Sequence, residues 1–235
     1  MPFDLPFLAE SFAALLRGIP LTLQLAALSV IAGGFLAFAL AFMRISGKWW
    51  LDAPAQFYIF VFRGTPLLVQ IYIIYYGLSQ FPMLRHSLLW PFLREAYWCA
   101  VLALAFNTAA YSAEIIRGGL LSVPAGQIEA ARACGMSGHL LFRRIVMPLA
   151  LRQMLPGYSN EIILMVKSTA LASTITLLEI TGIAAKLISV SYRTVEVFVC
   201  AGAIYLAINF LVARLFAWLE YTVSPETRRP EEHHA

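Results

Sequence analysis

Long apolar segments alternate with short polar ones along most of this chain. Five of the apolar segments are long enough to cross a bilayer at about 20 residues per span, and they cover 19–43, 55–78, 97–116, 154–180 and 197–221. Helices of this kind pair all of their backbone polar groups internally, as lipid requires. The pattern predicts an all-α membrane protein with five transmembrane helices in a single transmembrane domain over 1–223, followed by a polar C-terminal tail at 224–235. The intervening stretches 82–95 and 182–196 are expected to be loops.

Composition supports lipid as the main solvent. Hydrophobic residues make up 60% of the 235 and charged residues only 13%, whereas a soluble domain averages about 25% charged residues. The net charge of +4 is small and not concentrated in one block, which argues against a nucleic-acid-binding protein. The cysteines and histidines have no metal-ligand spacing, so no metal site is expected.

Lysine and arginine in the connecting segments indicate the orientation. They are more numerous in the segments that would be cytoplasmic if the N-terminus lay outside, as the positive-inside rule requires. The N-terminus is therefore expected outside and the C-terminus in the cytoplasm. No whole-span repeat is visible, unlike in many secondary transporters, and an odd number of spans favours a chain that works within an oligomer.

The longest polar stretch, about 122–150, is expected to lie on the cytoplasmic side. Pro124 can start a helix, Gly135 can stop it, and a second short helix would run from Gly138 to Pro148. A compact pair of short helices suits docking into a groove of a partner protein. The alternative is a solvated linker that merely joins two spans.

A resemblance to a known family favours the docking role over the linker. Glu129-Ala130-Ala131, then Gly135, then Ile145 and Pro148 resemble the EAA loop of ABC-type import permeases, with Met147 where leucine is usual. The change from leucine to methionine nearly conserves volume. In that family the loop inserts into the ATP-hydrolysing subunit, so the resemblance implies ATPase coupling for the residues Glu129, Ala130, Ala131, Gly135, Ile145 and Pro148.

The resemblance extends over nearly the whole chain. Segments such as 62–70, 107–114 and 167–171 are similar to the polar amino acid subfamily, and within it to the M-type subunit of histidine, lysine/arginine/ornithine and opine permeases. It implies a multi-pass protein of the bacterial inner membrane with four kinds of partner. These are two ATP-binding subunits, a homologous but different second permease subunit, a periplasmic or surface amino-acid-binding protein, and membrane lipid.

Polar groups inside the spans are the candidate substrate ligands, because ionisable groups there cost about 2.5–3.5 kcal/mol each on insertion scales. Glu161 can pair with a substrate ammonium or basic group; the alternative is a structural ion pair with Lys167 or Arg63. The Lys167-Ser168-Thr169 stretch can mark a broken helix whose free N–H groups bind a carboxylate. The alternative is that Ser168 and Thr169 bond back to the preceding turn.

Three further polar residues have competing roles. Arg63, beside Gly64-Thr65-Pro66, can bind a carboxylate or, with a slight preference, hold a Pro66 kink against a neighbouring subunit. Asn107 can bind substrate, but a bridge between helices is the favoured role. Glu114 is three residues from Arg117, which favours an ion pair at the membrane edge.

The chain contains no G-x-x-x-x-G-K-[ST] sequence, so ATP and Mg²⁺ are expected on a partner ATPase and no cofactor on this chain. A membrane protease would need motifs that are absent here. We therefore expect a non-enzymatic permease subunit of an ATP-driven importer of cationic amino acids or opines. A gradient-driven secondary transporter and a scaffold protein that moves no solute are the alternatives.

Overall fold

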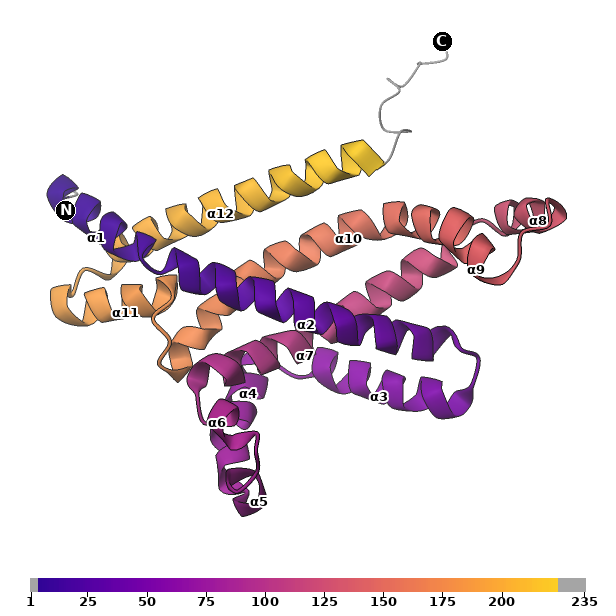
Figure 1. Ribbon diagram of the computed structural model, residues 1–235. Coiled ribbons are helices and arrows are strands. Elements are labelled where there is room, and N and C mark those ends of the chain that lie inside the picture. Colours follow the sequence, from indigo (N-terminus) through magenta and orange to yellow (C-terminus); the bar gives the residue numbers. More distant parts are fainter. Residues whose placement is uncertain (1–3, 224–235) are drawn as a thin grey trace, which may run out of the picture.

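The computed structural model describes residues 4–223, and the helices form a bundle with two projecting extensions (Figure 1). The expected polar tail at 224–235 lies outside the described residues. By length and apolar character, three helical segments can cross a membrane, and two bent helix pairs bring the possible spans to five. This confirms an all-α membrane fold and is compatible with the five predicted spans. The longer helices are α1 (Leu5–Leu16), α2 (Ile19–Ile45), α3 (Trp49–Gly64), α7 (Ala96–Leu121), α10 (Met147–Ser168), α11 (Ile180–Ser191) and α12 (Thr194–Val223).

Helices α2 and α7 pack tightly against each other through small residues. A Cβ added to Gly33 of α2 would lie 2.3 Å from Thr108 Cγ2 and 2.7 Å from the carbonyl oxygen of Ala105, both on α7. Ser29 Oγ donates to the carbonyl of Val101 at 3.3 Å across the same interface. Small side chains let helices approach closely in lipid, where packing replaces the hydrophobic effect.

The second span, expected over 55–78 with a kink at Pro66, is fully broken there. Helix α3 ends at Gly64, Thr65 is extended at φ −114° and ψ 145°, and the following segment Leu67–Gln80 turns by 105°. Pro66 lacks an N–H and disfavours helical backbone at the residue before it. The break is therefore encoded locally, although the size of the turn is set by packing.

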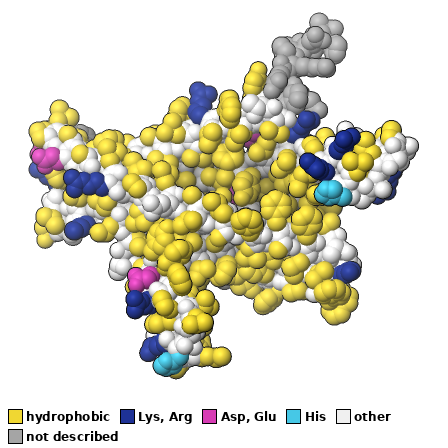
Figure 2. Space-filling model, in the orientation of Figure 1, with side chains coloured by type: hydrophobic (Ala, Val, Ile, Leu, Met, Phe, Trp, Pro, Cys, Tyr) yellow, Lys and Arg dark blue, Asp and Glu magenta, His cyan; other side chains and the backbone are white. Residues whose placement is uncertain are grey.

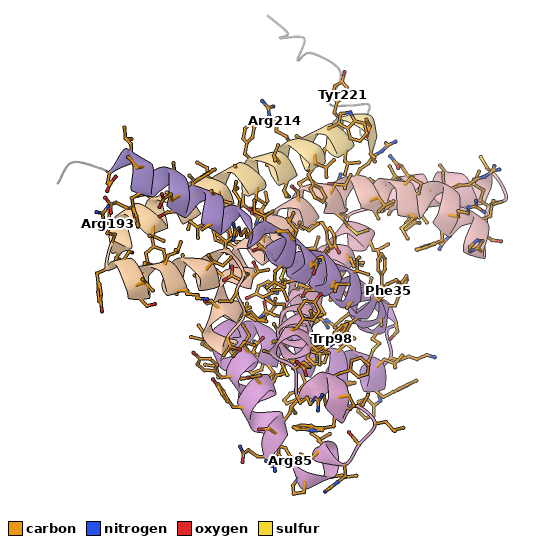
Figure 3. All side chains as sticks on the ribbon, turned by 60° about the vertical axis from the view of Figure 1, so that its left-hand side comes forward. Phe35, Arg85, Trp98, Arg193, Arg214 and Tyr221 are labelled. Carbon is orange, nitrogen blue, oxygen red and sulfur yellow. The ribbon has the colours of Figure 1, made fainter. Side chains whose placement is uncertain are left out.

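Beyond the break the chain forms an arm that leaves the bundle (Figure 1). Short elements follow one another: α4 (Leu67–Tyr72), a π-helical turn at Ile73–Gly77, a 3₁₀ turn at Leu78–Gln80, α5 (Pro82–Arg85) and α6 (Trp90–Leu93). Arg85 lies near the tip of the arm (Figure 3). Two short helices, α5 and α6, thus occupy the stretch 82–95 that was expected to be a loop.

The fourth span is also interrupted, and the prediction of a loop over 182–196 was wrong. Helix α10 passes into a 3₁₀ segment, Thr169–Ile175, and a new helix, α11, begins at Ile180 after a bend of 47°. Buried Glu179 caps α11 by accepting from the backbone N–H groups of Thr181 (2.9 Å) and Gly182 (2.8 Å). Such a cap provides acceptors for the free N–H groups at the start of a helix. Here the acceptor is the carboxylate of Glu179, which lies inside the bundle.

The long loop folds into helix α8 (Ala125–Ala133), helix α9 (Gly138–Leu141) and a π-helical turn, Phe142–Val146. Helix α8 ends in a Schellman motif, in which Met136 N donates to the Ala131 carbonyl at 3.0 Å and Gly135 has φ +81°. The expectation that Pro148 ends the second helix was wrong. The chain continues into α10 because Pro148 falls in its first turn, where a missing N–H is tolerated.

The two ends of the bundle differ in what they carry. Helices α1 and α11 lie at one end, whereas α8, α9 and the α2–α3 turn lie at the other (Figure 1). Arg193, just before α12, and Tyr221, near its end, are correspondingly far apart (Figure 3). At the first end Arg193 donates to Asp4 at 2.8 Å, and this hydrogen bond holds the pKa of Asp4 below its usual value.

Hydrophobic side chains cover most of the visible middle surface (Figure 2).

Candidate functional site

A cavity of about 330 Å³ lies where the broken second span meets α7 and α10. One wall is the break between α3 and α4, and the other walls come from the middle of α7 and the second half of α10. Its lining residues are Thr65, Pro66, Leu67, Asn107, Tyr111, Glu161, Leu164, Met165 and Ser168. The cavity thus gathers several of the polar groups that the sequence singled out.

Glu161 is the acidic group of this cavity. Its residue is 7% exposed, and its Oε1 accepts a hydrogen bond from Thr108 Oγ1 at 2.7 Å. Within residues 4–223, neither Lys167 nor Arg63 forms an ion pair with Glu161, so the structural ion pair considered from the sequence is not formed. A carboxylate on a cavity wall without a cationic partner is suited to a cationic ligand.

Gln70 and Asn107 hold the break in place. Gln70 Nε2 donates to the carbonyl of Phe62 at 2.8 Å and to Thr65 Oγ1 at 2.8 Å. Asn107 Nδ2 donates to Gln70 Oε1 at 3.1 Å and to the same Phe62 carbonyl at 3.3 Å. The favoured bridging role of Asn107 is confirmed, and it lines the cavity as well.

Gln70, Thr108 and Tyr111 were not among the site residues predicted from the sequence. The available signal for Gln70 was a polar residue four positions after Pro66 in an apolar segment. Thr108 was hidden because a hydroxyl in a membrane helix usually bonds to its own backbone. Only the packing of α7 on α10 gives it Glu161 as acceptor.

Arg63 lies at the end of α3 with its guanidinium 5.0 Å from the ring centre of Tyr111, a cation–π contact. Gln70 and Asn107 provide the hydrogen bonds that hold the Pro66 break within this chain, so that task does not fall to Arg63. Arg63 is exposed and close enough to Glu161 to attract it electrostatically. The cationic side chain of Arg63 and the acidic side chain of Glu161 thus lie near one cavity.

The Lys167-Ser168-Thr169 stretch is only partly brought to the cavity. Helix α10 does change to 3₁₀ geometry here, but Ser168 Oγ donates to the carbonyl of Leu164 and Thr169 Oγ1 to that of Val166, at 2.8 and 2.7 Å. Both hydroxyls therefore bond back to the preceding turn. Ser168 lines the cavity, Thr169 is buried, and Lys167 lines a separate cavity of about 410 Å³ beside α12.

The residues of the EAA-like pattern converge at the opposite end of α10. Glu129, Ala130 and Gly135 are exposed, whereas Ala131 is buried. Ala130 and Ala131 on α8 share a second cavity with Ile145 and Pro148 from the segment leading into α10. The loop thus has an exposed outer face and an inner face that packs toward the spans.

A charged network lies beside this loop. Glu114 on α7 accepts from Arg117 at 2.8 Å and from Arg44 Nε at 3.3 Å, and Arg44 also pairs with Asp52. The expected Glu114–Arg117 ion pair is confirmed. The structure adds Arg44 and Asp52, which join the ends of α2 and α3 to α7. No group of three possible metal ligands occurs within 4–223.

Comparison with known proteins gives one consistent family. The model for "Binding-protein-dependent transport system inner membrane component" matches residues 29–224. The chain is 76% identical over 233 residues to the octopine transport system permease protein of Rhizobium meliloti, covering 98% of this chain and 95% of that protein. It is 52% identical over 226 residues to the nopaline transport system permease protein of Agrobacterium fabrum, covering 96% and 94%.

A solved structure agrees with these relatives. The structure described as an amino acid ABC transporter with histidines superposes with a TM-score of 0.82 at 36% identity, covering 94% of this chain and all of the other.

Proposed function

The chain belongs to the family of binding-protein-dependent transport system inner membrane components, and from this membership we propose that it moves opines or related cationic amino acids inward. It is a non-enzymatic permease subunit of an ABC-type amino acid importer. ATP and Mg²⁺ belong to partner ATPase subunits.

The cavity at the break of the second span is the proposed substrate site. The permeases from Rhizobium meliloti and Agrobacterium fabrum are named for octopine and nopaline, which are amino acid conjugates with a guanidinium group and carboxylates. Glu161 offers a buried carboxylate to the guanidinium or ammonium, and Arg63 offers a bidentate partner to a carboxylate. The observation that carries this proposal is that buried Glu161 lines the cavity without an ion pair from any residue in 4–223.

The remaining site groups orient the solute. Asn107 and Ser168 line the same cavity and can bond to polar atoms of the solute. Lys167 and Thr169 were substrate candidates in the sequence, but they lie away from this cavity. We therefore assign the solute to the groups around Glu161 and not to Lys167.

The proposed topology places the N-terminus outside and the C-terminus in the cytoplasm, with helices α8 and α9 on the cytoplasmic side. Two ATPase subunits would bind there, and a binding protein would deliver solute from outside. A homologous second permease chain would complete the path. The exposed face of α8 with Glu129 and Ala130 suits contact with the ATPase, and Gly135, Ile145 and Pro148 shape the loop that presents it.

The proposed mechanism is alternating access. ATP binding draws the two ATPase subunits together and carries the α8–α9 loops of the two permease chains with them. Helix α7 is joined to α8 by the short connection 122–124 and also holds the break through Asn107. Displacement of the loop therefore has a short route along α7 to the substrate cavity, which opens outward before hydrolysis returns it.

The decisive experiment is uptake of labelled octopine and arginine into cells that express the complete transporter with Glu161→Gln. Losing a buried charge that pairs with substrate costs about 2–3 kcal/mol, so uptake should fall roughly 30- to 150-fold. Lys167→Gln, which removes a charge six residues away on the same helix, is the matched control and should leave uptake near that of the wild type.

Complex assembly is measured in both variants by co-purification of the ATPase. Normal uptake by an assembled Glu161→Gln complex would move the site elsewhere. Uptake that persists without ATP but fails when the ion gradient is collapsed would replace the ABC mechanism with a gradient-driven one.

A further inference from the structure

A second cavity, of about 450 Å³, lies between α8 and the segment that leads into α10. Ala130, Ala131, Met136, Ile145, Pro148 and Leu149 give it a mainly apolar lining. The polar side chains that line it are those of Gln127, Cys134, Arg144 and Arg152. The proposed transport mechanism uses the outer face of this loop but assigns no role to this inner space.

The two arginines of the cavity lack anionic partners. The Nε atom of Arg152 is buried and has no hydrogen-bond partner, and no Asp or Glu lines the cavity. Within the described part of the chain, neither Arg144 nor Arg152 takes part in an ion pair. Buried polar groups are nearly always bonded in native structures. An acceptor for Arg152 is therefore expected, and residues 4–223 do not supply one.

The surroundings carry the same sign of charge. Arg132, His139 and Arg143 are exposed on the same loop, and basic side chains gather over the α8–α9 end of the molecule in Figure 2. The acidic residue of this loop, Glu129, is exposed and outside the cavity. The local field therefore favours an anion.

The position of Arg152 specifies which anion fits. Met154, two residues further along α10, packs its side chain into the position beside Gly119 of α7, and Leu151 is 43% exposed on the outside of the helix. Arg152 thus lies on α10 beside apolar side chains that face both inward and outward. An apolar cavity with basic groups at the cytoplasmic boundary fits a molecule with an anionic head and an apolar body.

We propose that this cavity binds the phosphate of an anionic phospholipid from the cytoplasmic leaflet, with Arg144 and Arg152 as its ligands. The side of the membrane rests on the proposed function and topology. A carboxylate from the ATPase could satisfy the same charge, but the apolar lining favours a lipid, whose glycerol and acyl groups would cover Ile145 and Leu149. The lipid would tie α8 to α10 and stabilise the loop for coupling.

The test uses the complete purified transporter, stripped of lipid and placed in nanodiscs of phosphatidylcholine with or without phosphatidylglycerol. Bound phosphatidylglycerol is counted by native mass spectrometry, and ATPase activity is measured in the same discs. Arg144→Gln and Arg152→Gln should each lower phosphatidylglycerol retention about fivefold, as expected for one basic residue at an anionic surface. They should also abolish its stimulation of the ATPase.

Arg143→Gln is the matched control, because it removes the same charge from the neighbouring position without touching the cavity. Equal lipid loss in all three variants would reduce the effect to general surface charge and overturn the site. Release of the ATPase from Arg152→Gln, with lipid retention unchanged, would assign the cavity to an acidic side chain of that subunit. Stimulation by inorganic phosphate in phosphatidylcholine discs would show that the lipid body is not required.

Lipid retention is measured without any solute. Loss of the lipid site would therefore leave the proposed solute and the Glu161 test untouched. Failure of opine uptake, in turn, would leave the retention result standing.

Discussion

Gln70 and Arg63 show how much of the Pro66 break depends on contacts that residue type alone does not reveal. Arg63 stands next to the Pro66 kink in the sequence, so a structural role for its charge was favoured. In the structure a neutral amide holds the break: Gln70 donates to Phe62 and Thr65 and accepts from Asn107. An amide can donate and accept at once, whereas a guanidinium can only donate, and the break needs both.

The first prediction concerns this amide. Gln70→Ala would leave backbone and side-chain groups of the break without their partner, which costs about 1–3 kcal/mol. The purified transporter should therefore melt at a lower temperature in detergent and lose uptake. Gln80→Ala is the control, because Gln80 is exposed and makes one long bond, of 3.4 Å, to Tyr76. Equal melting of the two variants would contradict the role of Gln70.

At the scale of elements, the pairing of α2 with α7 has a direct consequence for the site. Gly33 allows α2 to approach Thr108 of α7 closely. The hydroxyl of Thr108 in turn donates to Glu161. Close packing of two helices and the position of the cavity carboxylate are thus linked through one side chain.

A methyl group added at Gly33 should test whether the packing of α2 on α7 affects the cavity. Gly33→Ala places a Cβ 2.7 Å from a backbone oxygen of α7, and overpacking of this kind costs about 1–3 kcal/mol. We expect a lower melting temperature and weaker solute binding, measured by calorimetry on the purified complex. Gly202→Ala on α12 meets no atom within 4 Å and should leave both unchanged. Wild-type behaviour of Gly33→Ala would show that the helices can separate at no cost.

The stop of α8 gives a second prediction at this scale. Gly135→Ala forces a side chain into φ +81°, at a cost of about 1–2 kcal/mol, and should distort the loop that contacts the ATPase. ATP hydrolysis should then become less dependent on solute, with less uptake per ATP. Gly126→Ala, inside α8 with open space around it, adds a better helix former and should keep coupling intact. Full coupling in Gly135→Ala would remove the loop from the mechanism.

For the whole molecule, the distribution of helices between its two ends permits a test of orientation. Cys134 on α8 is exposed, whereas Cys99 and Cys200 are buried, and Met83 near the arm tip is 89% exposed. A membrane-impermeant maleimide should label Cys134 in inside-out vesicles but not in intact spheroplasts. In a Cys134→Ser background, Met83→Cys should show the reverse. The opposite result for both positions would invert the topology.

The sequence by itself determined the class and most of the spans. Apolar length predicts helices because lipid leaves backbone groups no other partner, and the first, third and fifth spans were found within a few residues of α2, α7 and α12. The helix signals at Pro124 and Gly135 are also local, because each depends on backbone geometry that the residue itself imposes. The same holds for the Glu114–Arg117 pair, which helical spacing alone brings together.

Only the tertiary structure decided where the broken spans go and which polar groups meet. Hydropathy cannot distinguish a straight span from two helices at 105°, because both have the same apolar residues in the same order. Which cavity Lys167 and Glu161 each line depends on the helices that pack against α10. The hydrogen bond from Thr108, the bridge from Asn107 and the unpartnered Nε of Arg152 likewise arise from contacts between segments far apart in the chain, and local preference carries no information about such contacts.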